Sequence, residues 1–583
     1  MATDQQTICD NLDLWTSALL TKSTAGRGSN GKLEAYGIKK LRELILELAV
    51  RGKLVPQDPN DRPSSDLLKK IATEKRKLVK EGNIKKENFP EISDEEIPYQ
   101  LPDGWEWVRL GEYVHLEMGQ SPSSNSYNQE MNGLPFFQGK ADFGDIYPTA
   151  RYWCTHPQKF SFPGDVLLSV RAPVGPTNIS NIECCIGRGL AALRPLASTS
   201  TQFLLILMRA FQERLASLAT GTTFVAVSKK DIESLVVCVP PLAEQHRIVA
   251  KVDELMALCN RLEQQQTDSI AAHQTLVEIL LGTLTGVASP QELSVAWTRI
   301  ANHFDTLFTT EHSIDQLKQT ILQLAVMGKL APQDPNDEPA SVLLEKIAEE
   351  KERLADEGNI KKQKERSAIS DEDKLFNLPM EWQWVRLGDI SILKGGFAYK
   401  SSDFLDTGEC QVVRMGNIRP DYLRLDENPV FIPKKLGEET ADYQIECSDI
   451  LLTMTGTKGK RDYLYSLLVL PEHLKDRKLY LNQRLCIVRG LLVVPEFMNM
   501  TIKDERLLDA VYGKSTGTAN QANIGMVALN DWILPLPPLD EQHRIVAKVN
   551  ELMALCDTLK ARLADAQTTQ IHLADAIVEQ AVA

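Results

Sequence analysis

Several short motifs in this sequence contain residues with catalytic potential, but none has the spacing that a reaction needs. DPND, at 58–61 and 334–337, faintly resembles the DPPY loop of amino-methyltransferases. It lacks the aromatic residue that would stack on a flipped base, and no glycine-rich cofactor loop lies nearby, so a turn is favoured. GTKGK at 456–460 lacks the spacing of a phosphate-binding loop, and the GRG at 187–189 is too short for a dinucleotide fingerprint.

Histidine and cysteine form no recognisable reactive or metal-binding pattern either. His246 and His543 recur at equivalent places, each at a predicted helix start without an Asp or Ser at usable spacing. The ten cysteines form no CxxC pair, and neither HExxH nor a Cys/His zinc spacing occurs. We therefore expect no catalytic residue, no metal site and no disulfide framework, as is typical of a chain in a reducing cytoplasm.

Length and composition indicate a globular protein of several domains. One core rarely organises more than about 300 residues, and this chain has 583. Its longest apolar runs are far shorter than the roughly 20 residues that span a bilayer, and residues 1–15 have no secretory pattern, so we expect no membrane partner. The net charge of −14 argues against a protein that coats nucleic acid, although local charge decides binding.

Most of the chain is written twice, so the sequence is a tandem duplication. Residues 46–63 (LELAVRGKLVPQDPNDRP) return at 322–339, and LPDGWEWVRLGE at 101–112 returns as LPMEWQWVRLGD at 378–389. The first matches are displaced by 276 or 277 residues. The PPL-x-EQHRIVAKV match, at 240–252 and 537–549, is displaced by 297.

The extra length therefore falls between the Trp-x-Trp element and the EQHR element of each copy. We call these stretches insert 1 (101–240) and insert 2 (378–538), and the remainder the frame. The inserts share little sequence, and they are nearly neutral: 11 basic and 12 acidic residues in insert 1, and 19 and 21 in insert 2. A repeated frame with unlike inserts indicates that the frame performs one task twice while the inserts differ.

Long helices are predicted after each insert because apolar residues step by four and three, the seam of a heptad. The first helix is expected to reach about Leu281 and the second to run from Glu541 to near the end of the chain. One amphipathic helix cannot bury its stripe alone, so we expect the two to pack together. The predicted packing residues are Ile248, Val252, Leu255, Cys259, Leu262, Ile545, Val549, Leu552, Cys556 and Leu559.

The remaining segments complete a mixed α/β architecture. Residues 36–80 and 312–356 are predicted to be helical, broken by the GKL and PQDPND turns. Short apolar runs between Gly, Pro, Asn and Ser predict strands in the inserts. The predicted division is a helical frame region (1–100), insert 1 (101–240), a long helix (241–288), a second helical frame region (289–377), insert 2 (378–538) and a final long helix (539–583).

Four sequence elements together resemble the specificity subunits of type I restriction–modification systems over nearly the whole chain. They are the WxWVRLG entries, the block at 163–195, its looser counterpart SDILLTMTGTKG at 448–459, and the PPL-x-EQ-x-RIVAKV helices. The resemblance implies two target recognition domains separated by an antiparallel pair of long, coiled-coil-like helices. It further implies that the chain binds double-stranded DNA, two methyltransferase subunits and restriction or translocase subunits. S-adenosylmethionine, ATP and Mg would be bound by those partners, and no cofactor by this chain.

Within the inserts, polar residues on Gly-rich loops are candidates to contact DNA, because base edges need forked donors and acceptors and phosphates need cations. In insert 1 they are Gln120, Ser121, Ser123, Gln138, Lys140, Arg171, Arg188, Thr222, Thr223 and Lys229. In insert 2 they are Lys394, Lys400, Ser401, Arg414, Asn417, Lys458, Lys460, Asn482, Gln483, Thr516, Thr518 and Asn520. The function expected is sequence-specific DNA binding for phage defence, and the alternative is a coiled-coil adaptor without DNA reading.

Overall fold

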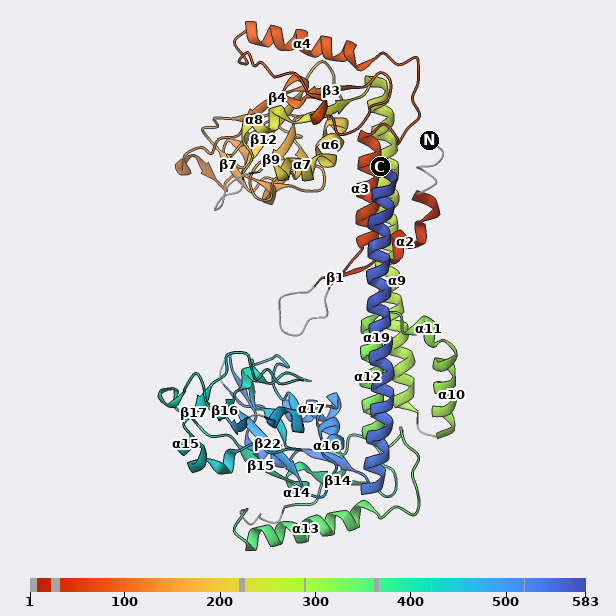
Figure 1. Ribbon diagram of the computed structural model, residues 1–583, viewed down its shortest axis with the longest axis vertical. Helices are drawn as coiled ribbons and strands as arrows, with labels where there is room; N and C mark the ends of the chain where they lie inside the picture. Colours follow the sequence, from red (N-terminus) through yellow and green to blue (C-terminus); the bar gives the residue numbers. More distant parts are fainter. Residues whose placement is uncertain are drawn as a thin grey trace. The chain divides into compact units, whose positions relative to one another are not determined.

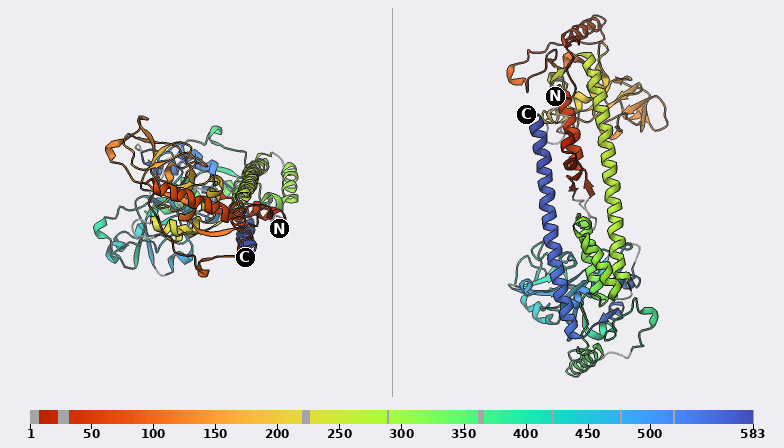
Figure 2. Two further views of the ribbon diagram at one scale, coloured as in Figure 1. Left: turned by 90° about the horizontal axis from the view of Figure 1, so that it is seen from above. Right: turned by 90° about the vertical axis from the view of Figure 1, so that its right-hand side faces the viewer.

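The computed structural model describes residues 8–22, 32–219, 226–287, 290–360, 366–420, 422–475, 477–517 and 520–582. These residues fall into two compact units. Unit 1 holds residues 8–22, 32–269 and 566–582, and unit 2 holds the described residues between 270 and 565. Each unit therefore combines one insert, one copy of the helical frame region and opposite ends of the two long helices (Figures 1 and 2).

The frame helices form where the sequence predicts them. The helical region of unit 1 contains α2 (Leu12–Ser17), α3 (Tyr36–Val50) and α4 (Ser64–Lys80). Its counterpart in unit 2 contains α10 (Pro290–Asn302), α11 (Phe304–Leu307), α12 (Glu311–Val326) and α13 (Ala340–Asp356). Both α3 and α12 end at a glycine in the left-handed region, Gly52 at φ +67° and Gly328 at φ +68°. A side chain there would also meet the ring of Pro102 or Pro379.

The DPND segments are turns, as their sequence predicts. Asp58 accepts hydrogen bonds from the backbone and side-chain nitrogens of Asn60, both at 2.9 Å, and Asp334 does the same with Asn336. These contacts within the turn lower the pKa of both aspartates.

The long helices are α9 (Leu242–Gly286) and α19 (Leu539–Val582), and α9 continues five residues beyond the predicted end. The beginning of α9 and the end of α19 belong to unit 1, and the reverse holds in unit 2, which is the arrangement of an antiparallel pair. Seven of the ten predicted seam residues are buried, and Leu262, Leu552 and Leu559 are partly buried against the same cores. Those cores also contain α3 in unit 1 and α12 in unit 2, so each seam is shared with a frame helix.

Polar contacts join the frame helices to both long helices in the same way in each unit. In unit 1, α3 reaches α9 through Arg42 and Glu263, 2.7 Å apart, and α19 through Lys40 and Asp575, 3.3 Å apart. Lys53 donates to the carbonyl of Ala581, and its counterpart Lys329 donates to the carbonyls of Thr285 and Val287 at the end of α9. Each frame region therefore holds the last turns of the long helix that begins in the other copy.

The two inserts share the core of their sheet topology despite their unlike sequences. Each has an antiparallel four-stranded sheet of the same strand order and a second sheet containing one parallel pair, with five strands in insert 1 and three in insert 2. The large sheets run β10 (Thr177–Ile179), β9 (Val166–Ser169), β12 (Leu190–Pro195), β4 (Val114–Met118), and β20 (Ser466–Leu468), β18 (Ile450–Thr453), β22 (Leu485–Gly490), β15 (Ser391–Gly395).

The second sheet of insert 1 runs β5 (Tyr127–Asn128), β7 (Tyr152–Cys154), β6 (Leu134–Phe137), β11 (Cys184–Ile186), β8 (Phe160–Ser161). That of insert 2 runs β17 (Phe431–Ile432), β16 (Cys410–Val413), β21 (Lys478–Leu481). A buried Asp–Arg pair also recurs, Asp165 with Arg194 and Asp449 with Arg489, and both aspartates are almost fully buried. The fold class is the expected mixed α/β duplication, with two sheet-rich inserts and a long helix between them in the chain.

Each insert is closed at its base by pairing its first strand with its last. β3 (Glu106–Arg109) pairs with β13 (Val236–Val239), and β14 (Gln383–Arg386) with β24 (Ile533–Leu536). The apolar runs that predict strands, at 164–170, 235–240, 449–454, 484–490 and 532–537, each contain one.

A repeated polar cluster fastens that base to the start of the long helix. Trp105 Nε1 donates to Glu244 Oε2 at 2.9 Å, and Arg247 forms an ion pair with Asp61 of the DPND turn at 2.7 Å. Glu244 is only 1% exposed, its Oε1 has no hydrogen-bond partner among the residues that the structure describes, and burial raises its pKa. The second copy repeats the cluster with Trp382, Glu541, Arg544 and Asp337. The EQHR and DPND repeats are therefore a joint between insert and frame.

Candidate nucleic-acid interface

Three of the candidate loops of insert 1 meet at the carboxyl ends of the parallel strands β6 and β11. Gln138 follows β6, and Arg188 follows β11 by one residue. Gln120 N donates to the carbonyl of Ile186 at 3.0 Å, and Ser121 Oγ accepts a hydrogen bond from Arg188 N at 3.3 Å. Because parallel strands end at the same edge of a sheet, segments separated by up to 68 residues become neighbours.

A buried aspartate shapes the loop after β6. Asp142 is 4% exposed, and its Oδ2 accepts hydrogen bonds from the backbone nitrogens of Gln138 at 2.7 Å and Gly139 at 3.4 Å. Its Oδ1 accepts one from Arg151 Nε at 2.7 Å. Asp142 was not among the candidate residues, although a carboxylate three or four residues after Gln-Gly is a signal for such a loop.

Insert 2 builds the same site from different residues. Arg414 follows β16, Asn482 follows the parallel strand β21, and Asn482 N donates to the carbonyl of Val413 at 3.1 Å. Asn417 Oδ1 accepts from Arg414 N at 2.9 Å, the position that Asp142 occupies in insert 1. The backbone N–H of Phe397, in the loop that follows β15, donates a hydrogen bond to the carbonyl of Leu481 at 3.0 Å.

These loops surround a pocket of about 700 Å³ in insert 2. It gathers five predicted residues: Ser401, Arg414, Asn417, Asn482 and Gln483. Arg419 and Arg484 also line it and were not predicted. Both lie within three residues of a predicted position. The sequence therefore predicted the loops but not these two arginines.

Most of the predicted contact residues in the described part of the chain are exposed. Lys394, Arg414 and Asn482 are half-buried, and Asn417 is buried at 4% exposure. Asn417 also donates to the carbonyl of Arg424, so both ends of its side-chain amide are engaged in shaping the loop. The exposed set is Gln120, Ser121, Ser123, Gln138, Lys140, Arg171, Arg188, Lys229, Lys400, Ser401, Lys458, Lys460, Gln483, Thr516 and Asn520.

Some predicted residues lie outside the two loop clusters. Lys229 begins α8 (Lys229–Ser234) and pairs with Glu87 and Glu233, and Lys394 on β15 pairs with Asp442. The others are on loops beside short pairings: Arg171, Lys458, Lys460, Thr516 and Asn520. Thr222, Thr223 and Thr518 lie outside the described residues.

The side chains of these loops are suited to the recognition of a nucleic acid. Exposed amides, guanidinium groups and hydroxyls can donate to and accept from base edges, and ammonium groups can pair with phosphates. No group of three or more His, Cys, Asp or Glu side chains able to hold a metal ion occurs among the residues that the structure describes. Within the same residues, no helix has the length and apolar character needed to cross a bilayer.

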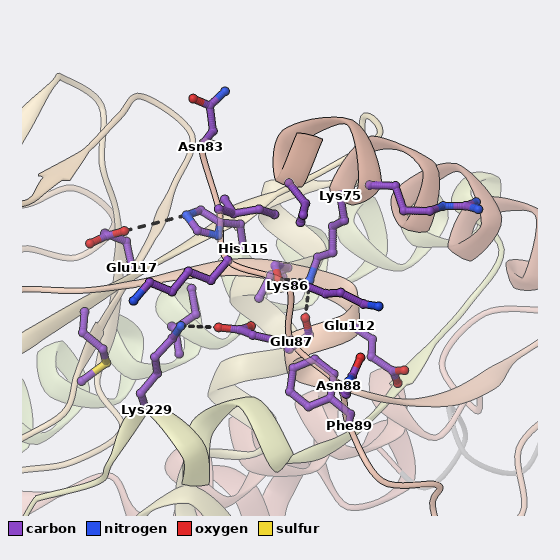
Figure 3. Close-up of a pocket in the computed structure, with 18 of the residues that line it drawn as sticks. Lys75, Asn83, Lys86, Glu87, Asn88, Phe89, Glu112, His115, Glu117 and Lys229 are labelled. Carbon is purple, nitrogen blue, oxygen red and sulfur yellow. Dashed lines mark hydrogen bonds and ion pairs between the residues drawn. The ribbon is translucent and has the colours of Figure 1, made fainter. Parts of the chain in front are cut away.

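A basic groove in unit 1 was not anticipated from the sequence. It has a volume of about 1,320 Å³ and is lined by α4, residues 83–89, β4 and single side chains of insert 1 (Figure 3). Gln120 and Lys229, both predicted contacts, line it as well. Because the inserts are nearly neutral, the frame carries most of the net negative charge of the chain, which favours protein contacts, and this average concealed a basic helix.

Comparisons with known proteins find relatives that match nearly the whole chain. The family described as "Type I restriction modification DNA specificity domain" matches residues 102–272 and 379–566. The chain is 41% identical to the type I restriction enzyme EcoAI specificity subunit of Escherichia coli and 38% identical to the EcoEI specificity subunit of the same species. Both matches cover 99% of this chain and 99% of the relative. A solved structure of an HsdS subunit from Thermoanaerobacter tengcongensis is 36% identical, with 45% of this chain and 64% of that chain covered and a TM-score of 0.27.

The duplicated fold, its exposed polar loops and these matches define a non-catalytic protein that recognises DNA. The chain belongs to the family of type I restriction–modification DNA specificity subunits. Membership of this family makes sequence specificity toward DNA its role within a restriction–modification system.

Proposed function

We propose that this chain reads an asymmetric, two-part DNA site, one half by each insert acting as a target recognition domain. The observation that carries the proposal is the recurrence of one loop cluster on one topology with different side chains. Where insert 1 has Gln138 and Arg188, insert 2 has Arg414 and Gln483. Because side chains at base edges decide which bases are accepted, unlike clusters should prefer unlike half-sites.

The frame supplies the second part of the proposal, the docking of partner subunits. Its two copies share the same helices and the same Trp–Glu and Arg–Asp cluster. Two equivalent frame surfaces suit two copies of one methyltransferase subunit, and restriction or translocase subunits would join them. The long helices would set the number of unread base pairs between the half-sites. S-adenosylmethionine, ATP and Mg would be held by the partners, and the complex would act in the cytoplasm.

The test is to co-express the chain with the methyltransferase gene that neighbours it, purify the complex and map adenine methylation by long-read sequencing. We expect one asymmetric motif of two short blocks around a fixed spacer. Exchanging residues 113–235 for those of a relative should change one block and leave the other intact. A palindromic or continuous motif would contradict reading by two unlike inserts. A complex that forms but methylates nothing would favour the adaptor alternative.

A further inference from the structure

The basic groove of unit 1 has a clear excess of positive charge over its acidic side chains. Its cations are Arg76 and Lys80 on α4, Lys85 and Lys86 on the following loop, and Lys159 and Lys229 of insert 1, beside the more buried Lys75. Lys80, Lys85 and Lys86 are exposed and have no ion-pair or hydrogen-bond partner among the described residues. These three ammonium groups are therefore available to a ligand.

The acidic residues of the groove, by contrast, already have partners. Glu87 pairs with Lys229 at 2.6 Å, and Glu117 pairs with Lys159. Glu112 Oε2 accepts a hydrogen bond from the backbone of Arg109 at 3.1 Å. Figure 3 shows the Lys229–Glu87 pair and the His115–Glu117 contact on the groove wall. Burial lowers the pKa of His115, so its imidazole adds little charge at neutral pH.

The groove is continuous with the loop cluster of insert 1. Gly119 and Gln120 line the groove, and Gln120 is hydrogen-bonded to β11 beside the loop that contains Arg188. A polyanion seated on the loop cluster would therefore have its next phosphates close to α4. Val79, Phe89 and Met118 add apolar surface to the lining of the groove, which suits the sugar units of a backbone.

The second copy of the frame repeats Lys85 and Lys86 in its sequence, as Lys361 and Lys362, but its helix does not repeat the charge of α4. Helix α4 carries six basic and two acidic residues, whereas α13 carries three basic and five acidic. At the positions equivalent to Arg76 and Lys80 the repeat has Glu352 and Asp356, and Met526 begins α18 (Met526–Asn530) where Lys229 begins α8. Yet Lys75 and its counterpart Lys351 make the same buried contact, Lys75 with the carbonyl of Gly111. The helix is thus placed alike in both units while only its charge differs.

We infer that the basic groove binds the sugar–phosphate backbone of the DNA flanking the half-site read by insert 1, and that unit 2 has no equivalent contact through α13. The inference rests on DNA recognition by insert 1, although it does not need a two-part site. Each phosphate contact contributes about 0.9 to the slope of log affinity against log salt. If that contribution vanishes at 1 M salt, one contact is worth about eightfold in affinity at 0.1 M.

The experiment measures the salt dependence of binding by the purified methyltransferase complex to a duplex of random sequence, about 40 base pairs long. Random sequence isolates backbone contacts, which carry no sequence information. The test variant is Arg76→Glu with Lys80→Asp, which installs the residues of the second copy. The matched control is Lys69→Glu with Lys70→Glu, because both lysines are exposed on the same helix outside the groove and the change in charge is equal.

We expect the slope to fall by about 2 in the test variant and affinity at 0.1 M salt to fall by about sixtyfold, with far smaller changes in the control. Equal effects of the two variants would overturn the inference, since only the general field would then matter. Loss of methyltransferase binding in the test variant alone would also overturn the inference. The groove would then bind an acidic surface of the methyltransferase subunit and not the DNA backbone. Lys85→Gln with Lys86→Gln, both on an exposed loop, repeats the test if the helix variant does not fold.

The two proposals fail separately. Binding to random duplex depends on the groove whether or not a two-part motif exists. A normal two-part methylation map with unchanged salt slopes would remove the groove contact alone. Altered slopes without any two-part motif would remove the proposed site reading and leave the groove contact intact.

Discussion

Replacing Asp142 by alanine should damage recognition of one half-site and spare the other. The substitution leaves the backbone nitrogens of Gln138 and Gly139 without their acceptor, at a residue that is 4% exposed. An unsatisfied buried donor costs about 1–3 kcal/mol. The loop can relieve part of this by moving into solvent, so we take about 2 kcal/mol as the loss of order, which corresponds to about thirtyfold in affinity.

The assay compares methylation rates on three duplexes: the mapped motif, the motif altered in its first block, and the motif altered in its second block. For Asp142→Ala, discrimination against changes in the block read by insert 1 should fall about thirtyfold, while discrimination in the other block stays unchanged. Arg151→Gln is the control, because it removes only the ion pair of an Arg151 side chain that is 54% exposed and keeps the backbone contacts of Asp142. An equal effect on both blocks, or no difference between Asp142→Ala and Arg151→Gln, would refute the reasoning.

Three further substitutions test the groove wall, the joint between insert 1 and the frame, and the loop cluster of insert 2. Burial lowers the pKa of Lys75 to about 8 in the folded protein, against 10.5 in the unfolded chain. Below pH 8 the buried ammonium group destabilises the fold through its desolvation, and this cost disappears as the pH rises toward 10.5. The free energy of unfolding in urea, measured for the parent relative to Lys75→Met, should therefore rise by up to about 3 kcal/mol between pH 8 and pH 10.5. The Lys70→Met variant should show the same pH dependence as the parent. Trp105→Phe removes the hydrogen bond to Glu244 and should cost about 1–3 kcal/mol in thermal unfolding without changing the methylated motif; an altered motif would contradict a purely structural joint. Arg414→Ala should lower discrimination in the block read by insert 2 by about 1–3 kcal/mol, and unchanged rates on altered duplexes would exclude a base contact.

Much of the frame could be predicted because its signals are local. Helix periodicity, the PQDPND turn and the heptad steps depend on residues a few positions apart, and α3, α4, α12 and α13 form where those signals lie. Duplication strengthened each prediction, because the same pattern occurs twice. The strands of the inserts were also predicted from short apolar runs, although nothing in the runs states which strands pair.

The loop clusters were predicted one loop at a time and not as sites. Gln138 and Arg188 become neighbours because β6 and β11 pair in parallel, which joins residues about 50 positions apart, and Gln120 joins them through its hydrogen bond to Ile186. The structural tasks of Asp142 and Asn417 depend on which backbone nitrogens face them after folding. The average charge of the frame did not predict the groove, because the groove collects lysines from α4, the loop of residues 83–89 and insert 1.

The sequence by itself determined the duplication, the frame helices, five of the insert strands, the lack of a complete catalytic motif and the family. Repeated text and local periodicity need no knowledge of long-range contacts. The tertiary structure alone decided that two unlike inserts share a core topology, that their polar loops converge at the same sheet edge, and that one copy of the frame presents a basic groove. These depend on strand pairing and burial, where many different apolar sequences satisfy the same core while exposed side chains remain free to differ.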